Sequence, residues 1–464
     1  MKRYEEYTTI DSRWANYIPA SWTFSKIAEV FIERKETNDP IKTTDILSLT
    51  NTRGVIPYRE KGNIGNKAKE DLTGYRLAYP EDIVFNSMNA VIGSVGLSKY
   101  FGAVSPVYYM LYLRDTAKNN IRFFDYVFQD RVFQSGLNGL GNGILEIRMR
   151  IPMSKLKYVG VPVPPRTEQD QIVRYLDWQV SKINRLIAAK RKEIALLKEQ
   201  KQRKITEVVV HGLKPNVPHK DTGIAWIGLI PAHWHCVALK RCATVKSGIT
   251  LGKQYPAGTN LVSVPYLRVA NVQDGFVNIE TVANLNVTPE EAAQYRLPRG
   301  CVLMTEGGDR DKLGRGCVWN GEIENCIHQN HIFAVTVNDK LLLNKWLEYV
   351  SACDIGRVYF DVTAIKTTNL ACTNASKVMA FPIPLPPRDE QECIINELNR
   401  ITSRFNNARE GLEKQIEYLQ ELRIRLISDV VTGQIDVRGI EVPEYEYVGE
   451  TNEAGEQDEE SEVG

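Results

Sequence analysis

The sequence predicts an α+β fold of two pseudo-symmetric, α/β-mixed domains separated by two long helices that form an antiparallel coiled coil. Three observations predict it: a long internal repeat, two polar segments with coiled-coil spacing of apolar residues, and strand-like runs in the segments before them. The expected parts are a first domain at 1–165, a helix at 166–212, a second domain at 213–387, a helix at 388–435, and an acidic, flexible tail at 436–464.

Length and composition restrict the class of protein. The chain has 464 residues, 43% hydrophobic and 25% charged, which predicts a soluble globular protein of roughly two to four domains and excludes collagen-like and disordered chains. No apolar run is long enough to span a bilayer, and the first residues lack the apolar core of a secretory signal. All eight cysteines lie between Cys236 and Cys393, which favours reduced thiols and a cytoplasmic location.

The repeat is carried by two pairs of motifs. Pro-Pro-Arg-Thr-Glu-Gln at Pro164–Gln169 recurs as Pro-Pro-Arg-Asp-Glu-Gln at Pro386–Gln391. A box that holds two tryptophans and Ile-Pro-Ala, at Trp14–Trp22, recurs at Trp226–Trp234. Because both pairs keep their order, the chain is two copies of one unit, a globular part followed by a polar helical segment.

The segments after the Pro-Pro-Arg motifs predict the long helices. Neither Gly nor Pro occurs from Thr167 to His211, and about 44 residues at 1.5 Å each make a helix roughly 65 Å long. Thr167 and Asp389 suit the N-cap position. Apolar residues recur at intervals of three and four, as in a coiled-coil seam, at Val173, Leu176, Val180, Ile183, Ile187, Ile194, Leu197, Ile205, Val208, Ile395, Leu398, Phe405, Leu412, Ile416, Leu419, Leu426 and Val430.

Polar residues interrupt both seams. Lys201 and Arg423 do so at equivalent positions of the repeat, and Lys190, Thr402 and Arg409 are further interruptions. Polar seam residues lower stability but fix register and partner. The simplest arrangement pairs the two helices within the chain; the alternative packs each helix on its own globular domain.

The globular parts have the signals of mixed domains. Three runs rich in β-branched and aromatic residues, Ile83–Phe85, Pro106–Leu113 and His331–Val337, predict strands. Short amphipathic segments at Arg122–Phe133 and Leu341–Cys353 predict helices. The order of the strands does not follow from these patterns.

Charge is distributed unevenly. Residues 439–464 hold ten of the 57 acidic residues and none of the 58 basic residues, so the rest of the chain has a net charge of +11. A basic body favours a polyanionic partner, although an ordinary soluble surface is an equal alternative on charge alone.

Several catalytic motifs are absent. The sequence has no phosphate-binding Gly-x-x-x-x-Gly-Lys loop, no Asn-Pro-Pro-aromatic or Asp-Pro-Pro-aromatic motif, and no His-Glu-x-x-His, Gly-x-Ser-x-Gly or Cys-x-x-Cys. Gly139–Gly143 is better interpreted as a turn than as a dinucleotide loop. Two Cys and His clusters are better interpreted as buried thiols and surface imidazoles than as metal sites; they comprise His233, His235, Cys236 and Cys242, and Cys317, Cys326, His328 and His331.

Basic and amide residues concentrate in loops of both globular parts. Arg and Asn read base edges in the major groove, and Lys and Arg also contact phosphates. Each residue alone is more often a solvated loop residue, but one cluster in each repeat favours two DNA-reading surfaces, as duplex DNA can present two half-sites to two domains. The candidates are Asn51, Arg53, Arg59, Lys61, Asn63 and Lys67 in the first domain and Arg268, Asn271, Arg310, Lys312 and Arg315 in the second.

The duplicated motifs resemble those of the specificity subunit of type I restriction–modification systems. The resemblance covers nearly the whole chain and rests on the two Trp boxes, the two Pro-Pro-x-x-Glu-Gln motifs with their helices, Lys220–Gly223 and Val430–Val437. Two features depart from the family pattern: Ala15–Tyr17 stands where the second box has Ile227–Leu229, and the acidic tail lies outside the family core.

The resemblance implies a DNA-binding subunit without an active site. Its globular parts would be target recognition domains that read the halves of a bipartite, asymmetric target in double-stranded DNA. Its helices would fix the half-site spacing and dock two DNA-methyltransferase subunits, which are partners of restriction/translocase subunits. This chain would hold no cofactor and no metal; S-adenosylmethionine, ATP and Mg would belong to the partners.

Two other classes of function stay open. The first is an enzyme in which one unit holds a divergent nuclease or methyltransferase site, which the missing motifs disfavour. The second is a coiled-coil scaffold without a nucleic-acid role, which predicts no DNA binding even with partners present. The acidic tail could be a solubility segment, a DNA mimic or a partner contact.

Overall fold

The computed structural model describes residues 2–51, 53–62, 67–141, 150–308, 313–314, 316–366 and 371–449. The chain divides into two compact units, residues 1–192 with 412–464 (unit 1) and residues 193–411 (unit 2). Each unit combines one globular domain with parts of two long helices, α5 (Arg166–His211) and α10 (Arg388–Val431). The predicted α+β class and its two long helices are confirmed.

The globular domain of unit 1 is built on a four-stranded antiparallel sheet of order β4-β11-β8-β9. Smaller sheets pair β1 with β2, β3 with β12, β5 with β6 and β7 with β10. The elements are β1 (Tyr7–Thr9), β2 (Tyr17–Pro19), β3 (Thr23–Lys26), α1 (Ile27–Val30), β4 (Phe31–Arg34), β5 (Leu47–Thr50), β6 (Gly54–Pro57), η1 (Tyr58–Glu60), β7 (Arg76–Ala78), β8 (Ile83–Asn86), η2 (Ala90–Ile92), β9 (Val95–Leu97), β10 (Gly102–Val104), β11 (Tyr108–Leu113), α2 (Ile121–Gln129), α3 (Arg131–Gly136), α4 (Met153–Leu156) and β12 (Gly160–Val163).

The domain of unit 2 repeats this plan. Its four-stranded antiparallel sheet has the order β16-β23-β19-β21, strand for strand the counterpart of the first. Two three-stranded sheets, β18-β17-β22 and β20-β25-β24, are added to it. The elements are β13 (His219–Asp221), β14 (Leu229–Pro231), β15 (His235–Ala238), η3 (Leu239–Arg241), β16 (Ala243–Ser247), β17 (Val262–Leu267), η4 (Val269–Asn271), β18 (Ala283–Val287), α6 (Pro289–Gln294), β19 (Val302–Thr305), β20 (Gly307–Gly308), β21 (Gly316–Val318), β22 (Ile327–His328), β23 (Ile332–Val337), α7 (Asn344–Ala352), α8 (Asp354–Thr363), β24 (Ile365–Lys366), β25 (Ala371–Cys372), α9 (Ala375–Ala380) and β26 (Pro382–Leu385).

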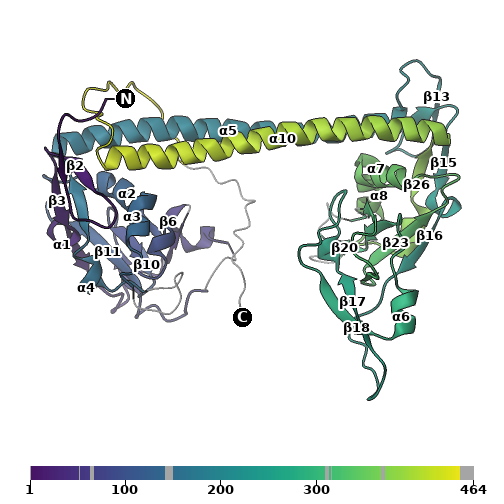
Figure 1. Ribbon diagram of the computed structural model, residues 1–464, viewed down its shortest axis with the longest axis horizontal. Helices are drawn as coiled ribbons and strands as arrows, with labels where there is room; N and C mark the ends of the chain where they lie inside the picture. The colour runs from purple at the N-terminus through teal and green to yellow at the C-terminus, as the bar shows by residue number, and fades with distance from the viewer. Residues whose placement is uncertain are drawn as a thin grey trace. The chain divides into compact units, whose positions relative to one another are not determined.

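The two long helices pack against each other within each unit. In unit 1 the start of α5 lies beside the end of α10 (Figure 1), and Arg423 donates a hydrogen bond to Asn184 Oδ1 at 3.0 Å. In unit 2 the end of α5 lies beside the start of α10, and Lys201 Nζ donates to Asn406 Oδ1 at 3.1 Å. The helices are therefore antiparallel, and the predicted pairing within the chain is confirmed.

Each helix also packs on a globular domain. The helices therefore combine both arrangements considered above, which are pairing with each other and packing on a domain. The core of unit 1 joins Ile172 and Leu176 of α5 to Phe123 of α2, all fully buried. The core of unit 2 joins Ile394 and Leu398 of α10 to Trp346 of α7. Burial of such side chains contributes about 1.5–3 kcal/mol each, so each helix end is fixed to its domain.

The repeated motifs form the junction between domain and helix. Trp22 Nε1 donates to Glu168 at 3.0 Å, and Trp234 Nε1 donates to Glu390 at 3.2 Å. Gln169 accepts the Asn120 amide at 2.7 Å and donates to the Pro164 carbonyl at 2.8 Å. Gln391 makes the equivalent bonds with Leu343, at 2.9 Å, and Pro386, at 3.0 Å. The two motifs recur because each domain is attached to its helix by the same bonds.

The helices end at equivalent glycines. Gly212 follows α5 with a φ of +71°, and Gly433 follows α10 with a φ of +73°. A left-handed residue after a helix is usually glycine because a Cβ is unfavourable there. The glycines also lie against the tryptophans, since an added Cβ would be 3.0 Å from Trp234 and 3.3 Å from Trp22.

The last part of the chain differs from the expected tail. Residues 437–449 lie along unit 1 and Val437 is fully buried, whereas a flexible tail was expected from residue 436. The flexible tail was expected from the acidic composition of this segment. Its apolar residues Val437, Ile440 and Val442 nevertheless pack on the core of unit 1. Residues 450–464 lie outside the described part of the chain.

Candidate nucleic-acid interface

The basic loop of unit 1 begins in the hairpin of β5 and β6. Asn51 and Arg53 lie in the turn and are exposed. The Arg53 amide donates to Thr50 Oγ1 at 2.9 Å, and its guanidinium binds the carbonyl of Glu60 at 3.0 Å and the carboxylate at 3.2 Å. The ion pair is exposed and therefore weak, so Arg53 can exchange Glu60 for a phosphate or a base.

Two tyrosines hold the rest of this loop. The hydroxyl of Tyr58 accepts the Ala68 amide at 3.0 Å, and the hydroxyl of Tyr75 accepts the Lys69 amide at 3.1 Å. Lys61 lies over the Tyr58 ring, 5.5 Å from its centre. Arg59 and Lys67 are exposed on the same segment, so these cations project from an anchored backbone. Asn63, the remaining candidate, lies outside the described residues.

In unit 2 the two candidates Arg268 and Asn271 differ in exposure. Arg268 is exposed at the end of β17. Asn271 is 3% exposed: its Oδ1 accepts the Arg268 amide at 2.8 Å, and its Nδ2 donates to the carbonyls of Asn278 at 2.9 Å and Thr281 at 3.0 Å. Asn271 therefore shapes the loop that presents Arg268 and is not retained as a base contact. Arg310, Lys312 and Arg315 lie outside the described residues.

Arg296, which was not among the candidates from the sequence, lies near Arg268. The backbone of Arg296 pairs with Ile327, and Ile327 pairs in parallel with Tyr266, two residues before Arg268. Arg296 is exposed, so two arginines flank β22. The run Arg-Leu-Pro-Arg-Gly at residues 296–300 carried the signal, since basic residues beside a Pro-Gly turn are typical of an exposed loop.

The cysteines and histidines do not form a metal site in the described part of the chain, where no group of three or more His, Cys, Asp or Glu side chains gathers. Cys317 and Cys326 are buried, and burial raises the pKa of both thiols to about 12. His233, His235 and His331 are exposed, as expected. His328 is 2% exposed and corrects the expectation of a surface imidazole.

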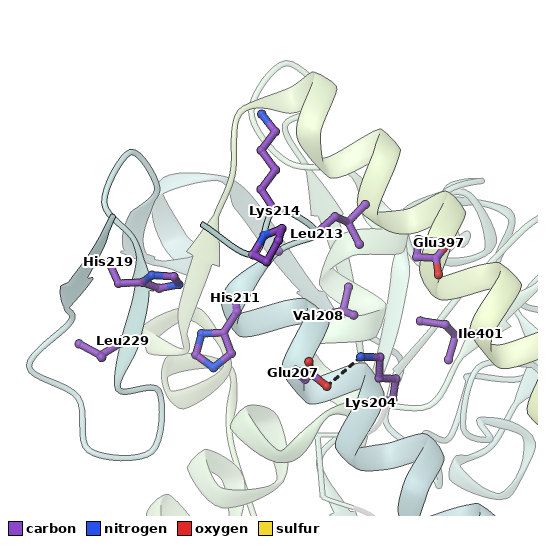
Figure 2. Close-up of a pocket in the computed structure, with 12 residues that line it drawn as sticks. Lys204, Glu207, Val208, His211, Leu213, Lys214, His219, Leu229, Glu397 and Ile401 are labelled. Atoms are coloured by element: carbon purple, nitrogen blue, oxygen red, sulfur yellow. Dashed lines mark hydrogen bonds and ion pairs between the residues drawn. The ribbon is translucent and has the colours of Figure 1, made fainter. Parts of the chain in front are cut away.

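An open groove of about 760 Å³ lies in unit 2 where α5 ends. Figure 2 shows His211, Lys204 and Glu207 on α5, His219 on β13 and Glu397 on α10 around it. The repeat explains the opening: Tyr7, Tyr17 and Tyr175 stand in unit 1 where unit 2 has His219, Leu229 and Glu397. Tyr7 donates a hydrogen bond to the carbonyl of Gly433 at 2.9 Å, and Tyr175 is 2% exposed.

The groove is not part of the basic loops. Figure 1 shows β13 at the helix side of unit 2, whereas β17 and β18, which hold the loops around Arg268, lie far from the helices. Cations and carboxylates alternate around the groove, and Lys204 is paired with Glu207 at 2.9 Å. The arrangement therefore lacks the net positive charge that a nucleic-acid site requires.

The first part of the chain is similar to a known family. Residues 19–196 match the model of the type I restriction modification DNA specificity domain. This part of the chain is therefore similar to such a specificity domain. The resemblance stated from the Trp boxes and Pro-Pro-x-x-Glu-Gln motifs is thereby confirmed, and the matched residues include Pro19–Trp22 at the end of the first box, the first motif and the start of α5.

One curated relative and two solved structures are also similar to the chain. The specificity subunit of type I restriction enzyme MjaX from Methanocaldococcus jannaschii is 25% identical over 208 residues, 44% of this chain and 47% of that protein. The chain thus matches about half the length of this relative. A structure from a study of complex assembly and conformational transition of the type I R-M system is 15% identical, covers 90% of this chain and 99% of its own, and has a TM-score of 0.62. It supports the fold.

A further solved structure is the HsdS subunit of Thermoanaerobacter tengcongensis, which is 16% identical and covers 90% of this chain and 98% of its own. Its TM-score of 0.44 is too low to carry an argument. Within the described ranges, no helix of this chain is both long and apolar enough to cross a bilayer.

Proposed function

We propose that this chain is the DNA-recognition subunit of a type I restriction–modification complex and reads a bipartite, asymmetric sequence in double-stranded DNA. The observation that carries the proposal is the duplicated frame: two sheets of the same strand order, joined to their helices by the same Trp–Glu bonds, with different added sheets and loops. One frame with two sets of loops suits two different half-sites.

In this proposal α5 and α10 set the half-site spacing and dock two DNA-methyltransferase subunits, with restriction/translocase subunits completing the complex. Exposed apolar side chains on the helices of unit 1 support docking: Leu186 is 50% exposed, Tyr418 68% and Leu422 54%. Large apolar side chains exposed on a helix favour a protein partner. The chain itself would be non-catalytic and act in the cytoplasm, and S-adenosylmethionine, ATP and Mg would be bound by the partners.

The proposal is tested by mapping methylated bases in cells with and without the gene. Loss of one bipartite methylated sequence on deletion is expected, and an unchanged methylome contradicts the proposal. The purified chain, given S-adenosylmethionine and DNA, should methylate nothing without partner subunits.

Substitution of Arg268 tests the reading surface of unit 2. An arginine–guanine contact is worth about 1–3 kcal/mol, so Arg268→Ala should reduce methylation about tenfold and relax preference in one half-site only. The matched control is Lys340→Ala, an exposed cation beside Leu341, whose carbonyl accepts a hydrogen bond from Gln391 at the helix junction. Wild-type methylation in Arg268→Ala would remove Arg268 from the reading surface.

A further inference from the structure

Beyond α10 the chain runs back along unit 1 as an extended segment, Val437–Gly449, which we call the brace (Figure 1). It is bound to α5 near both of its ends. The Gln171 side chain donates to the carbonyls of Val437 at 3.1 Å and Ile440 at 2.6 Å. Toward the other end, the Val448 amide donates to Ser181 Oγ at 3.1 Å, and Asn184 Nδ2 donates to the Val448 carbonyl at 3.1 Å.

Charge and apolar packing add to these bonds. Arg185 donates to the Glu446 carbonyl at 2.7 Å and lies 3.5 Å from its carboxylate. Ile440 and Val442 pack on the hydrophobic core of unit 1. The residues of α5 that hold the brace, at positions 171, 181, 184 and 185, recur at intervals that place them on one side of the helix.

The brace also meets the globular domain. Arg122 of α2 forms an ion pair with Asp177 of α5 at 2.7 Å, and Tyr126 of α2 donates to the same carboxylate at 2.8 Å. Tyr447 of the brace lies over the Arg122 guanidinium, 5.9 Å from ring centre to carbon. The brace therefore contacts domain and helix at the corner where they join.

In the described part of unit 2, the junction between α7 and α10 is equivalent to that between α2 and α5, where the brace binds. The repeat places Tyr349 and Asn399 where unit 1 has Tyr126 and Asp177, and Tyr349 donates to Asn399 Oδ1 at 2.8 Å. Lys345, the counterpart of Arg122, pairs with Glu348 instead. On α10 the counterparts of Gln171, Ser181 and Arg185 are Cys393, Ser403 and Asn407, all exposed within the described part of unit 2.

We propose that the brace fixes the angle at which the first domain sits on α5, and that accurate half-site spacing depends on this angle. Gln171, Arg185 and Tyr447 are its positioning residues. The mechanical part of the proposal stands on the contacts alone, whereas the part on spacing rests on the proposed function. The second domain, whose corner has a neutral Asn399, is expected to work without a brace.

Two truncations test the mechanical part. A chain that ends at Asp436 loses the brace, and the control that ends at Gly449 loses only residues 450–464, with seven acidic residues. Amide hydrogen exchange in α2 and in residues 171–185 should become about tenfold faster in the first chain, with α7 and residues 393–407 unchanged; the control should match the full chain. Unchanged exchange in unit 1, or an equal rise in unit 2, overturns the brace.

Spacing tolerance tests the functional part. Once the native target is known, methylation in cells is compared for sites whose spacer is native or one base pair longer or shorter. The full chain and Tyr447→Phe, which keeps the ring, should accept the native spacer only. Tyr447→Ala and the chain ending at Asp436 should accept the altered spacers at least fivefold better.

The outcomes separate the two proposals. Faster exchange with unchanged spacing tolerance overturns the positioning role. If the full chain supports no methylation at all, the proposed function fails, while the exchange result still decides whether the brace holds the domain. Tyr447→Ala keeps the test decisive if the shorter chain does not fold.

Discussion

At the scale of single residues, the junctions between domain and helix depend on buried polar groups that are hydrogen-bonded to one another. Glu168 illustrates this: it is 6% exposed and accepts hydrogen bonds from Trp22 and from the Tyr4 hydroxyl. Burial, followed by the bond to Glu168, raises the pKa of Tyr4 well above its ordinary value. Such a carboxylate is costly to bury unless its partners are in place, so the Trp box and the Glu-Gln motif must be present together.

His328 makes the stability of unit 2 depend on pH. It is buried in β22, and burial lowers its pKa, an effect that backbone groups of Lys246 and Tyr295 partly offset. The folded chain therefore holds His328 neutral below pH 6.5, where the unfolded chain binds a proton. The free energy of unfolding should fall by up to about 1.4 kcal/mol per pH unit as the pH drops below 6.5.

Urea denaturation at pH 7.5, 6.0 and 5.0 measures this dependence. His328→Gln cannot titrate and should lose less stability between pH 7.5 and 5.0 than the wild-type chain. His235→Gln, which changes an exposed side chain, is the control and should follow the wild type. Equal slopes for His328→Gln and wild type would exclude His328 as the source.

Residue chemistry alone could not assign the reading surface. Arg53, Arg268 and Asn271 were all predicted to contact DNA; the two arginines are exposed, but Asn271 is buried. Its role depends on the turn from residue 271 to 281, whose carbonyls its side chain binds. Loop conformation of this kind is set by long-range contacts, which no local pattern in the sequence records.

At the scale of elements, two polar pairs set the register of the long helices. Asn184 with Arg423 and Lys201 with Asn406 are related by the repeat: Lys201 lies 17 residues after Asn184, and Asn406 lies 17 residues before Arg423. In an antiparallel helix pair of constant register, a step forward along one helix is matched by an equal step backward along the other, as it is here. Burial lowers the pKa of Lys201, which is the cost of placing an ammonium in an apolar seam.

A double-mutant cycle tests the Lys201–Asn406 pair. Lys201→Leu and Asn406→Leu each leave one polar group without its partner and should lower the free energy of unfolding by about 1 kcal/mol. The double variant restores an apolar seam and should be at least as stable as the wild type. Urea denaturation measures all four chains, and single effects that simply add would show that the pair is not coupled.

The sequence predicted the elements with strong periodicity. The expected helices at 166–212 and 388–435 correspond to α5 and to α10, which ends four residues earlier than expected, and the runs at Ile83–Phe85 and His331–Val337 correspond to β8 and β23. The segment Arg122–Phe133 is divided into α2 and α3 because Asp130 caps α3 by accepting the amides of Val132 and Phe133. The strand order and the brace could not be predicted from the sequence, since both depend on contacts between residues that are distant along the chain.

At the scale of the whole molecule, duplication separates what must be constant from what can vary. The four-stranded sheets and the Trp–Glu junctions are the same in both units. The hairpin of β5 and β6 in unit 1 and the sheet β18-β17-β22 in unit 2 differ. The proposed function requires this division, because in it the frame sets the spacing and the loops select the bases.

If the helix pair sets the spacing, lengthening it should change only the spacing. We expect seven residues inserted after Glu193 in α5 together with seven after Glu413 in α10 to preserve both polar pairs, because these points lie opposite each other in the register of Asn184 with Arg423. Seven residues add about 10.5 Å, which equals about three base pairs at 3.4 Å each. Methylation mapping should find the same half-sites with a spacer about three base pairs longer.

The insertion in α5 alone is the matched control. It moves Lys201 away from Asn406 or Asn184 away from Arg423, so one unit must lose its seam or the added residues must leave the helix. We therefore expect reduced methylation and no new spacing from the single insertion. Altered half-site bases with the native spacer in the double insertion would mean that the loops sense the helices directly, and the division between frame and loops would then be incorrect.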